Sequence, residues 1–151
     1  NMHETGLVDV YMDILGNEYF TQQSIRFITT LRNDFTQAVN MFNDLIDTPN
    51  QKIKIYSISR SQADFMLFRN GLKLMCSLKK VGEVCFRMSY LNPQPPVAGE
   101  TNTFESKDQE DIILGVHGPM GNIEWQYKNR PINTEALIRY YMIRFTRESV
   151  L

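Results

Sequence analysis

Residues 63–91 of the chain read ADFMLFRNGLKLMCSLKKVGEVCFRMSYL, and two short turn signals divide this stretch into three apolar-rich segments. The first signal is Asn70-Gly71. Asparagine and glycine tolerate the positive φ angles that both central residues of a type I′ hairpin turn adopt. The predicted antiparallel partners across this turn are Arg69 with Leu72, Leu67 with Leu74, Phe65 with Cys76, and Met66 with Met75.

The second signal, Lys79-Lys80-Val81-Gly82, is compatible with two strand registers. A two-residue loop at Lys80-Val81 would set polar residues opposite apolar ones. A three-residue loop with Gly82 as a left-handed bulge residue instead gives one uniformly apolar face, and a shift of one residue would turn that face to water. We therefore expect the second register. Its pairs are Lys79 with Glu83, Leu78 with Val84, Cys76 with Phe86, Leu74 with Met88, and Leu72 with Tyr90.

Further strands flank these hairpins in the sequence. Residues 52–58 alternate between apolar and polar side chains, which is typical of a half-buried strand. Residues 112–117 and 122–128 predict another hairpin, because Gly118-Pro119-Met120-Gly121 supplies a turn between them. The alternating apolar residues of its two arms are Ile112, Leu114 and Val116, then Ile123, Trp125 and Tyr127.

Two helices are expected at the ends of the chain. Residues 21–47 predict an amphipathic helix, capped by Thr21 or Ser24 and ended by Pro49. Its expected buried stripe is Ile28, Leu31, Phe35, Ala38, Phe42 and Leu45. Residues 134–148 predict a second helix, for which Asn133 is the N-cap. Residues 7–15 fit both a strand and a helix, with the helix slightly favoured.

These elements predict an α+β fold of two layers: an antiparallel sheet of about six strands, flanked by a long N-terminal helix and a C-terminal helix. Both helices would pack on the one strongly apolar face of the sheet. The chain of 151 residues is expected to form a single domain, residues 1–151. The polar, proline-containing stretch 92–110 is predicted to be a mobile loop within that domain.

Composition excludes several classes of function. The formal net charge is −1, so no excess of positive charge attracts nucleic acid or an acidic membrane surface. No apolar run approaches the roughly 18–20 residues that span a bilayer, and no secretory signal is visible. We therefore expect a cytoplasmic protein. Asn1 before Met2 resembles a residue left by an expression tag, which would make Met2 the native start.

No pattern of reactive side chains predicts catalysis. The two histidines, His3 and His117, have no Cys, Asp or Glu at metal-binding spacing. Cys76 lies on the predicted core face, where a thiol is inert, and Cys85 is only a weak candidate nucleophile. The register sets the two cysteines on opposite faces, so a disulfide between them is excluded. We expect no enzyme activity, no cofactor and no metal.

The sheet face opposite the predicted core carries Met66, Phe68, Met75 and Arg87. A mixed apolar and basic face of this kind is typical of a contact with a partner, because methionine, aromatic residues and arginine are enriched in interface cores. The leading hypothesis is a non-catalytic protein-interaction module that binds another protein or itself, as a homodimer, through this face or an edge strand. Residues 7–20 could instead cover the face from within the chain.

An alternative hypothesis follows if residues 7–15 form a strand. The element order is then similar to that of the helix-grip (START-like) architecture, in which a curved sheet wraps a C-terminal helix around an apolar cavity. The resemblance is one of element order alone and includes no motif. It implies a carrier of a small apolar ligand, with Tyr90, Trp125 and Tyr141 lining the cavity. Secretion-type chaperones resemble this helix–sheet–helix order too, but they are usually more acidic.

Overall fold

The computed structural model describes the backbone of residues 2–58, 63–90 and 109–150, with side chains described from residue 16 in the first range and from residue 110 in the last. These ranges contain two α-helices, one 3-10 helix and seven strands. The helical elements are α1 (Met2–Asn43), η1 (Pro49–Gln51) and α2 (Thr134–Glu148). The strands are β1 (Lys54–Ser57), β2 (Phe65–Arg69), β3 (Leu72–Lys80), β4 (Glu83–Tyr90), β5 (Gln109–His117), β6 (Ile123–Tyr127) and β7 (Arg130–Pro131).

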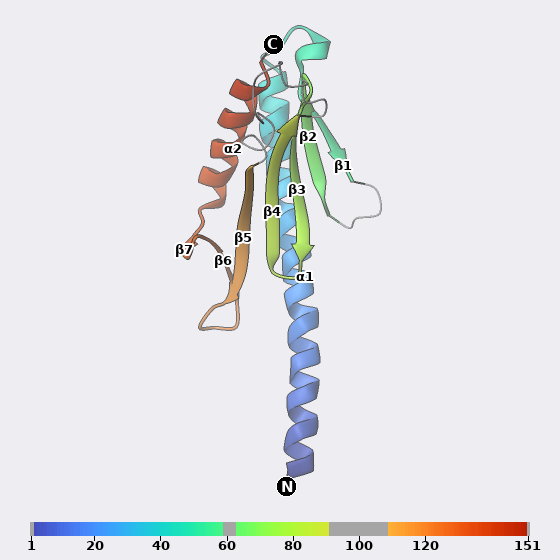
Figure 1. Ribbon diagram of the computed structural model, residues 1–151, viewed down its shortest axis with the longest axis vertical. Helices are drawn as coiled ribbons and strands as arrows, with labels where there is room; N and C mark the ends of the chain where they lie inside the picture. The colour runs from blue at the N-terminus through green and yellow to red at the C-terminus, as the bar shows by residue number, and fades with distance from the viewer. Residues whose placement is uncertain (1, 59–62, 91–108, 151) are drawn as a thin grey trace, which may run out of the picture.

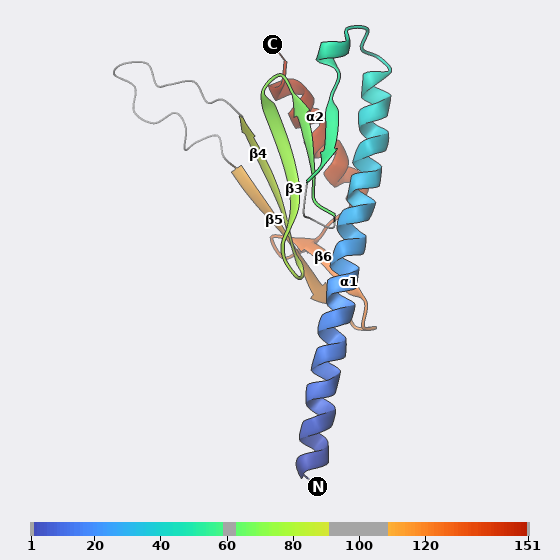
Figure 2. The same ribbon diagram turned by 90° about the vertical axis from the view of Figure 1, so that its right-hand side faces the viewer.

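The strands form one open antiparallel sheet in which each strand pairs with the next along the chain, in the order β1-β2-β3-β4-β5-β6-β7. Both helices pack on the same face of this sheet, and they also contact each other (Figures 1 and 2). The predicted two-layer α+β fold is therefore confirmed, with one more strand than expected. The extra strand is the two-residue β7, whose Pro131 lacks the N–H that a further strand would need.

The registers predicted around the two turns are confirmed almost throughout. Phe65 pairs with Cys76, Cys76 with Phe86, and Leu72 with Tyr90. The predicted pair of Lys79 with Glu83 is wrong, because a bulge between Leu78 and Lys80 sets Lys80 opposite Glu83. The bulge leaves the Lys79 ammonium free to bond the Glu110 carboxylate on β5, at 2.8 Å.

Helix α1 is continuous from Met2, so residues 7–15 are helical and the strand interpretation of that segment is wrong. Thr21 and Ser24 lie inside the helix and are not its N-caps. Each hydroxyl donates a hydrogen bond to the carbonyl four residues earlier, at 2.8 Å. The N-terminal part of α1 extends beyond the sheet (Figures 1 and 2).

The C-terminal end of α1 comes earlier than predicted. The helix ends at Asn43, whose side-chain amide pairs with both backbone polar groups of Ile53 at 2.8 and 2.9 Å. These hydrogen bonds between distant residues end the helix before Pro49. Leu45, expected on the buried stripe, is consequently 82% exposed, whereas Val39 is buried. Of the other predicted stripe residues, Ile28, Leu31 and Phe35 are buried, and Ala38 and Phe42 are half-buried.

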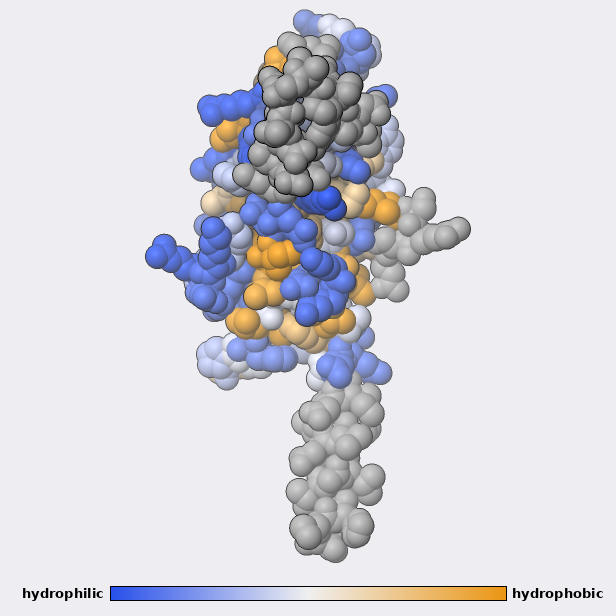
Figure 3. Space-filling model, viewed as in Figure 1, coloured by the Kyte–Doolittle hydropathy of each residue, from blue (hydrophilic) through white to orange (hydrophobic). Residues whose placement is uncertain are grey.

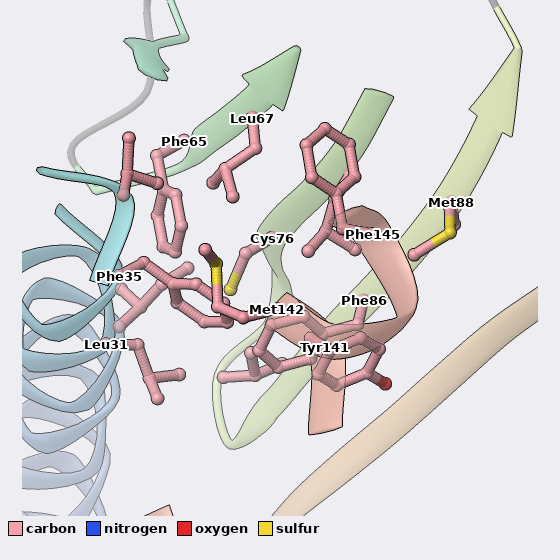
Figure 4. Packing of buried hydrophobic residues seen from close by; sticks show 14 of the residues in the cluster. Leu31, Phe35, Phe65, Leu67, Cys76, Phe86, Met88, Tyr141, Met142 and Phe145 are labelled. Atoms are coloured by element: carbon pink, nitrogen blue, oxygen red, sulfur yellow. The ribbon is translucent and has the colours of Figure 1, made fainter. Parts of the chain in front are cut away.

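The core lies between the helices and the inner face of the sheet, and it combines aliphatic side chains with several aromatic rings (Figure 4). The Phe35 ring of α1 lies 5.6 Å from that of Phe65 and 6.0 Å from that of Phe86. The Tyr141 ring of α2 stacks on Phe86 with centroids 4.4 Å apart. One continuous cluster thus joins both helices to the central strands.

The remaining predictions concern the second half of the chain. Helix α2 has the predicted bounds, and the Asn133 side chain accepts a hydrogen bond from the Ala136 N–H, so the predicted cap is confirmed. The stretch predicted to be a mobile loop was 92–110. Its last two residues instead begin β5, and residues 92–108 lie outside the part of the chain that the structure describes.

Gly82 is the point at which α1 is attached to the β3–β4 turn. Its N–H donates a hydrogen bond to the buried Ser24 hydroxyl at 2.9 Å, and its φ is +78°. A Cβ at this position would overlap the Phe20 ring, whereas at Gly71, where φ is +82°, a Cβ would meet nothing. Two constraints therefore act at Gly82 and one acts at Gly71.

We expect Gly82→Ala to lower the free energy of unfolding by about 2 kcal/mol and Gly71→Ala by about 1 kcal/mol, because both strain the backbone but only the first displaces a packed ring. Urea denaturation monitored by circular dichroism measures both. In a Phe20→Ala background the two losses should become equal. Equal losses in the wild-type background would show that Phe20 does not pack against the turn.

Candidate functional site

The sheet face opposite the helices, here called the outer face, carries the four residues predicted to bind a protein. Met66, Met75 and Arg87 stand side by side in one row across β2, β3 and β4, and Phe68 lies in the neighbouring row opposite Lys73. Met66, Phe68 and Met75 are half-buried, and Arg87 is exposed. Their position on a shared face away from the core is confirmed, while their role stays a prediction.

Three more apolar residues belong to this face, and sequence reasoning did not assign them to it. Cys85 pairs with Ile112, and Glu83 pairs with Leu114, so the alternation of Ile112, Leu114 and Val116 points outward. Ile113, between them, is fully buried. The inward side of the strand has Ile113 as its one large apolar residue, beside Asp111, Gly115 and His117, so the alternation by itself would indicate the wrong side as the core-facing one.

The outer face is a mixed surface. Tyr56, which pairs with Met66 and extends the row onto β1, and Leu114, which pairs with Glu83, are each 44% exposed. Figure 3 shows hydrophobic surface over β4 and β5, with hydrophilic side chains around it. Neither α-helix lies over this face (Figure 2). It is therefore a partly apolar surface that the described helices leave uncovered.

Charged residues also lie on this face, since Glu110 pairs with Arg87 and continues the row of Met66 and Met75. The Lys79 ammonium lies 2.8 Å from Glu110, and the Lys80 ammonium lies 4.0 Å from Glu83. The hydrogen bond between Lys79 and Glu110 lowers the pKa of the carboxyl and raises the pKa of the ammonium. Both groups therefore stay charged around neutral pH, and their ion pair joins β3 to β5 across β4, on the outer face itself.

The two cysteines are free and buried on opposite faces of the sheet. Burial raises the pKa of the Cys76 thiol well above its ordinary value. Burial, helped by a hydrogen bond with Glu110, raises the pKa of Cys85 to about 11. Because the thiolate is the nucleophile, a thiol with so high a pKa is a poor one at neutral pH.

The three residues predicted to line a ligand cavity lie in separate places. The Trp125 ring stacks on Phe27 of α1, with centroids 4.2 Å apart. The Tyr90 hydroxyl lies 3.4 Å from the Glu148 carbonyl oxygen at the end of α2. Tyr141 lines a cavity that neither Tyr90 nor Trp125 borders, so that cavity does not bring the three together.

That cavity lies between the N-terminal half of α2 and the strands β5, β6 and β7, and it has a volume of about 470 Å³. Its walls are mainly apolar and aromatic, and its polar groups come from one acid, three tyrosines, an asparagine and an arginine. The lining residues are Asp111, Ile113, Tyr127, Arg130, Pro131, Ile132, Asn133, Ala136, Leu137, Tyr140 and Tyr141.

Asp111 is at the centre of the polar part of this cavity. Its pairing with Phe86 turns it to the inner face, beneath the Tyr141 ring. Tyr127 donates a hydrogen bond to one carboxylate oxygen at 3.0 Å, and Tyr141 donates to the other at 2.6 Å. If the sequence had shown which side of β5 faces the core, it would have identified Asp111 as an acid on the core face.

Both tyrosines keep their protons at neutral pH. The hydrogen bond to Asp111 raises the pKa of Tyr127, and burial together with the hydrogen bond to Asp111 raises the pKa of Tyr141. Each hydroxyl therefore acts as a donor to the carboxylate. The arrangement can hold a charged ligand group, but it offers no activated nucleophile.

Within the described ranges, no group of three or more His, Cys, Asp or Glu is arranged to hold a metal ion. His117 lies against the Phe20 ring, with centroids 5.1 Å apart. No helix in the described part of the chain is long and apolar enough to cross a membrane. Comparisons with protein-family models, curated proteins and solved structures found no match for this chain.

Proposed function

We propose that the protein is a non-catalytic interaction module that binds another protein, or a second copy of itself, through the outer face. The observation that carries the proposal is the continuous row of Met66, Met75 and Arg87, with Phe68 beside it, on a face that neither described helix covers. Ile112, Leu114 and Val116 enlarge the same apolar surface. Exposed surface on which methionine, aromatic and arginine side chains gather commonly marks a binding surface.

Two further features agree with this proposal. The high pKa of Cys85 makes the one thiol beside the outer face a poor nucleophile, which favours binding over catalysis. The open edge strand β1 carries Lys54, a residue type that discourages unspecific strand pairing. Binding through the face is therefore preferred to binding through this edge.

We expect the double variant Phe68→Ala with Arg87→Ala to raise the dissociation constant of the complex at least about tenfold, because aromatic and arginine side chains are the commonest interface anchors. Solution mass by light scattering during size-exclusion chromatography measures this for a homodimer. A matched control is Ile143→Ala with Arg147→Ala, which removes one large apolar and one basic side chain from the exposed surface of α2.

Comparison of the wild type, the Phe68/Arg87 variant and the Ile143/Arg147 control distinguishes the possible outcomes. A dimer that the control retains and the Phe68/Arg87 variant loses supports self-association through the outer face. A wild-type monomer at high concentration would exclude self-association. The test is then affinity capture, in which partners must bind wild type and control but not the variant. A dimer unaffected by the Phe68/Arg87 variant would contradict the proposed surface.

A second candidate function is carriage of a small, partly apolar ligand. The cavity of about 470 Å³ favours it, because ligand sites are typically concave, largely apolar and supplied with a few converging polar groups. Of the three residues expected in such a site, Tyr141 is the one that lines it. This function and protein binding are compatible, since the cavity and the outer face lie on opposite sides of the sheet.

A further inference from the structure

The polar groups of the cavity beside α2 are matched to one chemical class of ligand. Asp111 supplies a carboxylate, and Tyr127 and Tyr141 both direct their hydroxyl protons at it. Once these protons are engaged, the phenol oxygens offer only lone pairs to a third group. The centre of the cavity thus presents acceptors and a negative charge, without a free donor from this triad.

We propose that this cavity binds a small organic ammonium ion, that is, a primary or secondary amine on an apolar or aromatic body. The inference rests on the second candidate function, ligand carriage, and names its ligand class. An ionised carboxylate has about four acceptor sites, and the two tyrosines use two of them. The remaining sites suit the N–H donors of an ammonium group, in a charge-assisted hydrogen bond.

The charges near Asp111 leave it available for such a ligand. Among the described residues, Asp111 takes part in no ion pair. Arg130 lines the cavity but is exposed, and the Lys128 ammonium lies 5.3 Å from the centre of the Tyr127 ring. Solvent screens cations at such exposed positions, so they oppose a second cation only weakly.

The aromatic walls add a second attraction for a cation. Tyr140 and Tyr141 are packed edge to face, with centroids 5.1 Å apart, and both line the cavity. The face of a tyrosine ring attracts an ammonium group within about 6 Å of its centre. Ile132, Ala136 and Leu137 supply apolar surface for the body of the ligand.

The test uses three probes of one shape on the full chain: 2-phenylethylamine, 2-phenylethanol and 3-phenylpropionate. Titration of ¹⁵N-labelled protein by NMR gives the dissociation constants and shows which residues respond. We expect the amine to bind about tenfold more tightly than the alcohol, because both can donate a hydrogen bond to the carboxylate but only the amine carries a positive charge opposite it. The largest chemical-shift changes should fall on residues 111–113 and 127–137.

Three variants localise the effect. Asp111→Asn removes the charge with little change of shape and should weaken amine binding about tenfold. Tyr127→Phe keeps the carboxylate but frees the acceptor site that the Tyr127 hydroxyl occupies, so it should tighten amine binding; weaker amine binding in this variant would contradict the proposal even if Asp111→Asn is poorly folded. Glu124→Gln, on the outer face, removes one charge away from the cavity and should have no effect.

Each other outcome overturns the inference in a distinct way. Equal binding of amine and alcohol would refute the ammonium proposal and leave ligand carriage standing. Preferential binding of 3-phenylpropionate would reassign the cavity to anions held by Arg130. Failure of all three probes to shift any cavity resonance of the folded protein would refute both the ammonium proposal and ligand carriage through this cavity.

Discussion

Replacing Phe65 with alanine is expected to lower the free energy of unfolding by about 3–5 kcal/mol, the usual cost of truncating a buried phenylalanine. The Phe65 side chain is 1% exposed and lies 5.6 Å from the Phe35 ring, at the contact between β2 and α1. The loss combines the lost burial of the ring with the cavity that it leaves. A domain of this size has only about 5–15 kcal/mol of stability in total, so chemical denaturation should show a large shift of the midpoint.

Phe68→Ala is the matched control, because Phe68 lies three residues away on the same strand but on the outer face. We expect it to cost about 1 kcal/mol or less, since the face is not packed against the core. The comparison tests the two-face assignment of β2 independently of any partner. Similar losses for the two variants would show that the outer face is part of a packed interior, and would contradict the proposed binding surface.

The second large effect is expected at Arg69, where alanine should lower the free energy of unfolding by about 3 kcal/mol. The side chain is 8% exposed and makes no ion pair with the described residues. Its guanidinium instead donates hydrogen bonds to the carbonyl of Gln51, to the carbonyl of Thr146 in the last turn of α2, and to the Ser149 hydroxyl. It also lies 5.0 Å from the centre of the Phe42 ring.

The physical reason is that one side chain connects the end of α1, η1, β2 and the end of α2. Its removal leaves several acceptors without a donor, at about 1 kcal/mol or more each, and removes a cation from the negative end of the α2 dipole. Arg69→Lys should recover only part of the loss, because lysine lacks the planar set of donors. Arg147→Ala, an exposed arginine on the same helix end, should change stability by less than about 0.5 kcal/mol.

A loss of under 1 kcal/mol for Arg69→Ala would mean that water replaces the guanidinium at these acceptors. In that case the ends of the two helices would be held together by the core alone. Arg69→Met distinguishes the two contributions, since methionine keeps much of the packing and none of the hydrogen bonds. Thermal unfolding of all four variants under one condition provides the comparison.

The strand registers around Asn70-Gly71 and Gly82 were predictable because their causes are local. Asn70, Gly71 and Gly82 adopt the positive φ angles that the turns require. Once a turn is set, the alternation of the side chains decides the register, because any slip exposes Leu74 and Cys76 together. Only the position of the bulge, at Lys79 instead of Gly82, was wrong.

The errors in helix α1 occurred where contacts distant in sequence overrule a local pattern. Ser24 has the chemistry of an N-cap, but its hydroxyl serves the N–H of Gly82, 58 positions away. Leu45 continues the helical periodicity, but the exchange between Asn43 and Ile53 ends the helix first. Propensity and periodicity are weak compared with tertiary hydrogen bonds of this kind.

The two candidate sites also differ in whether a local sequence pattern could predict them. The outer-face residues Met66, Phe68, Met75 and Arg87 were found from the hairpin register alone. The cavity could not be found, because it depends on the register between β4 and β5, and those strands are separated by a long connection without a turn signal. That register sets Asp111 opposite Phe86 and within reach of Tyr141.

The sequence by itself determined the class of fold, the presence of a helix at each end of the chain, and the two faces of the three-stranded unit formed by β2, β3 and β4. It could do so because short turns and the alternation of side chains are local properties. The tertiary structure alone decided which parity of β5 faces the core, where α1 ends, and that Asp111 meets two tyrosines. These features require residues tens of positions apart to come together. The packing of the whole domain selects them, and no local segment contains that information.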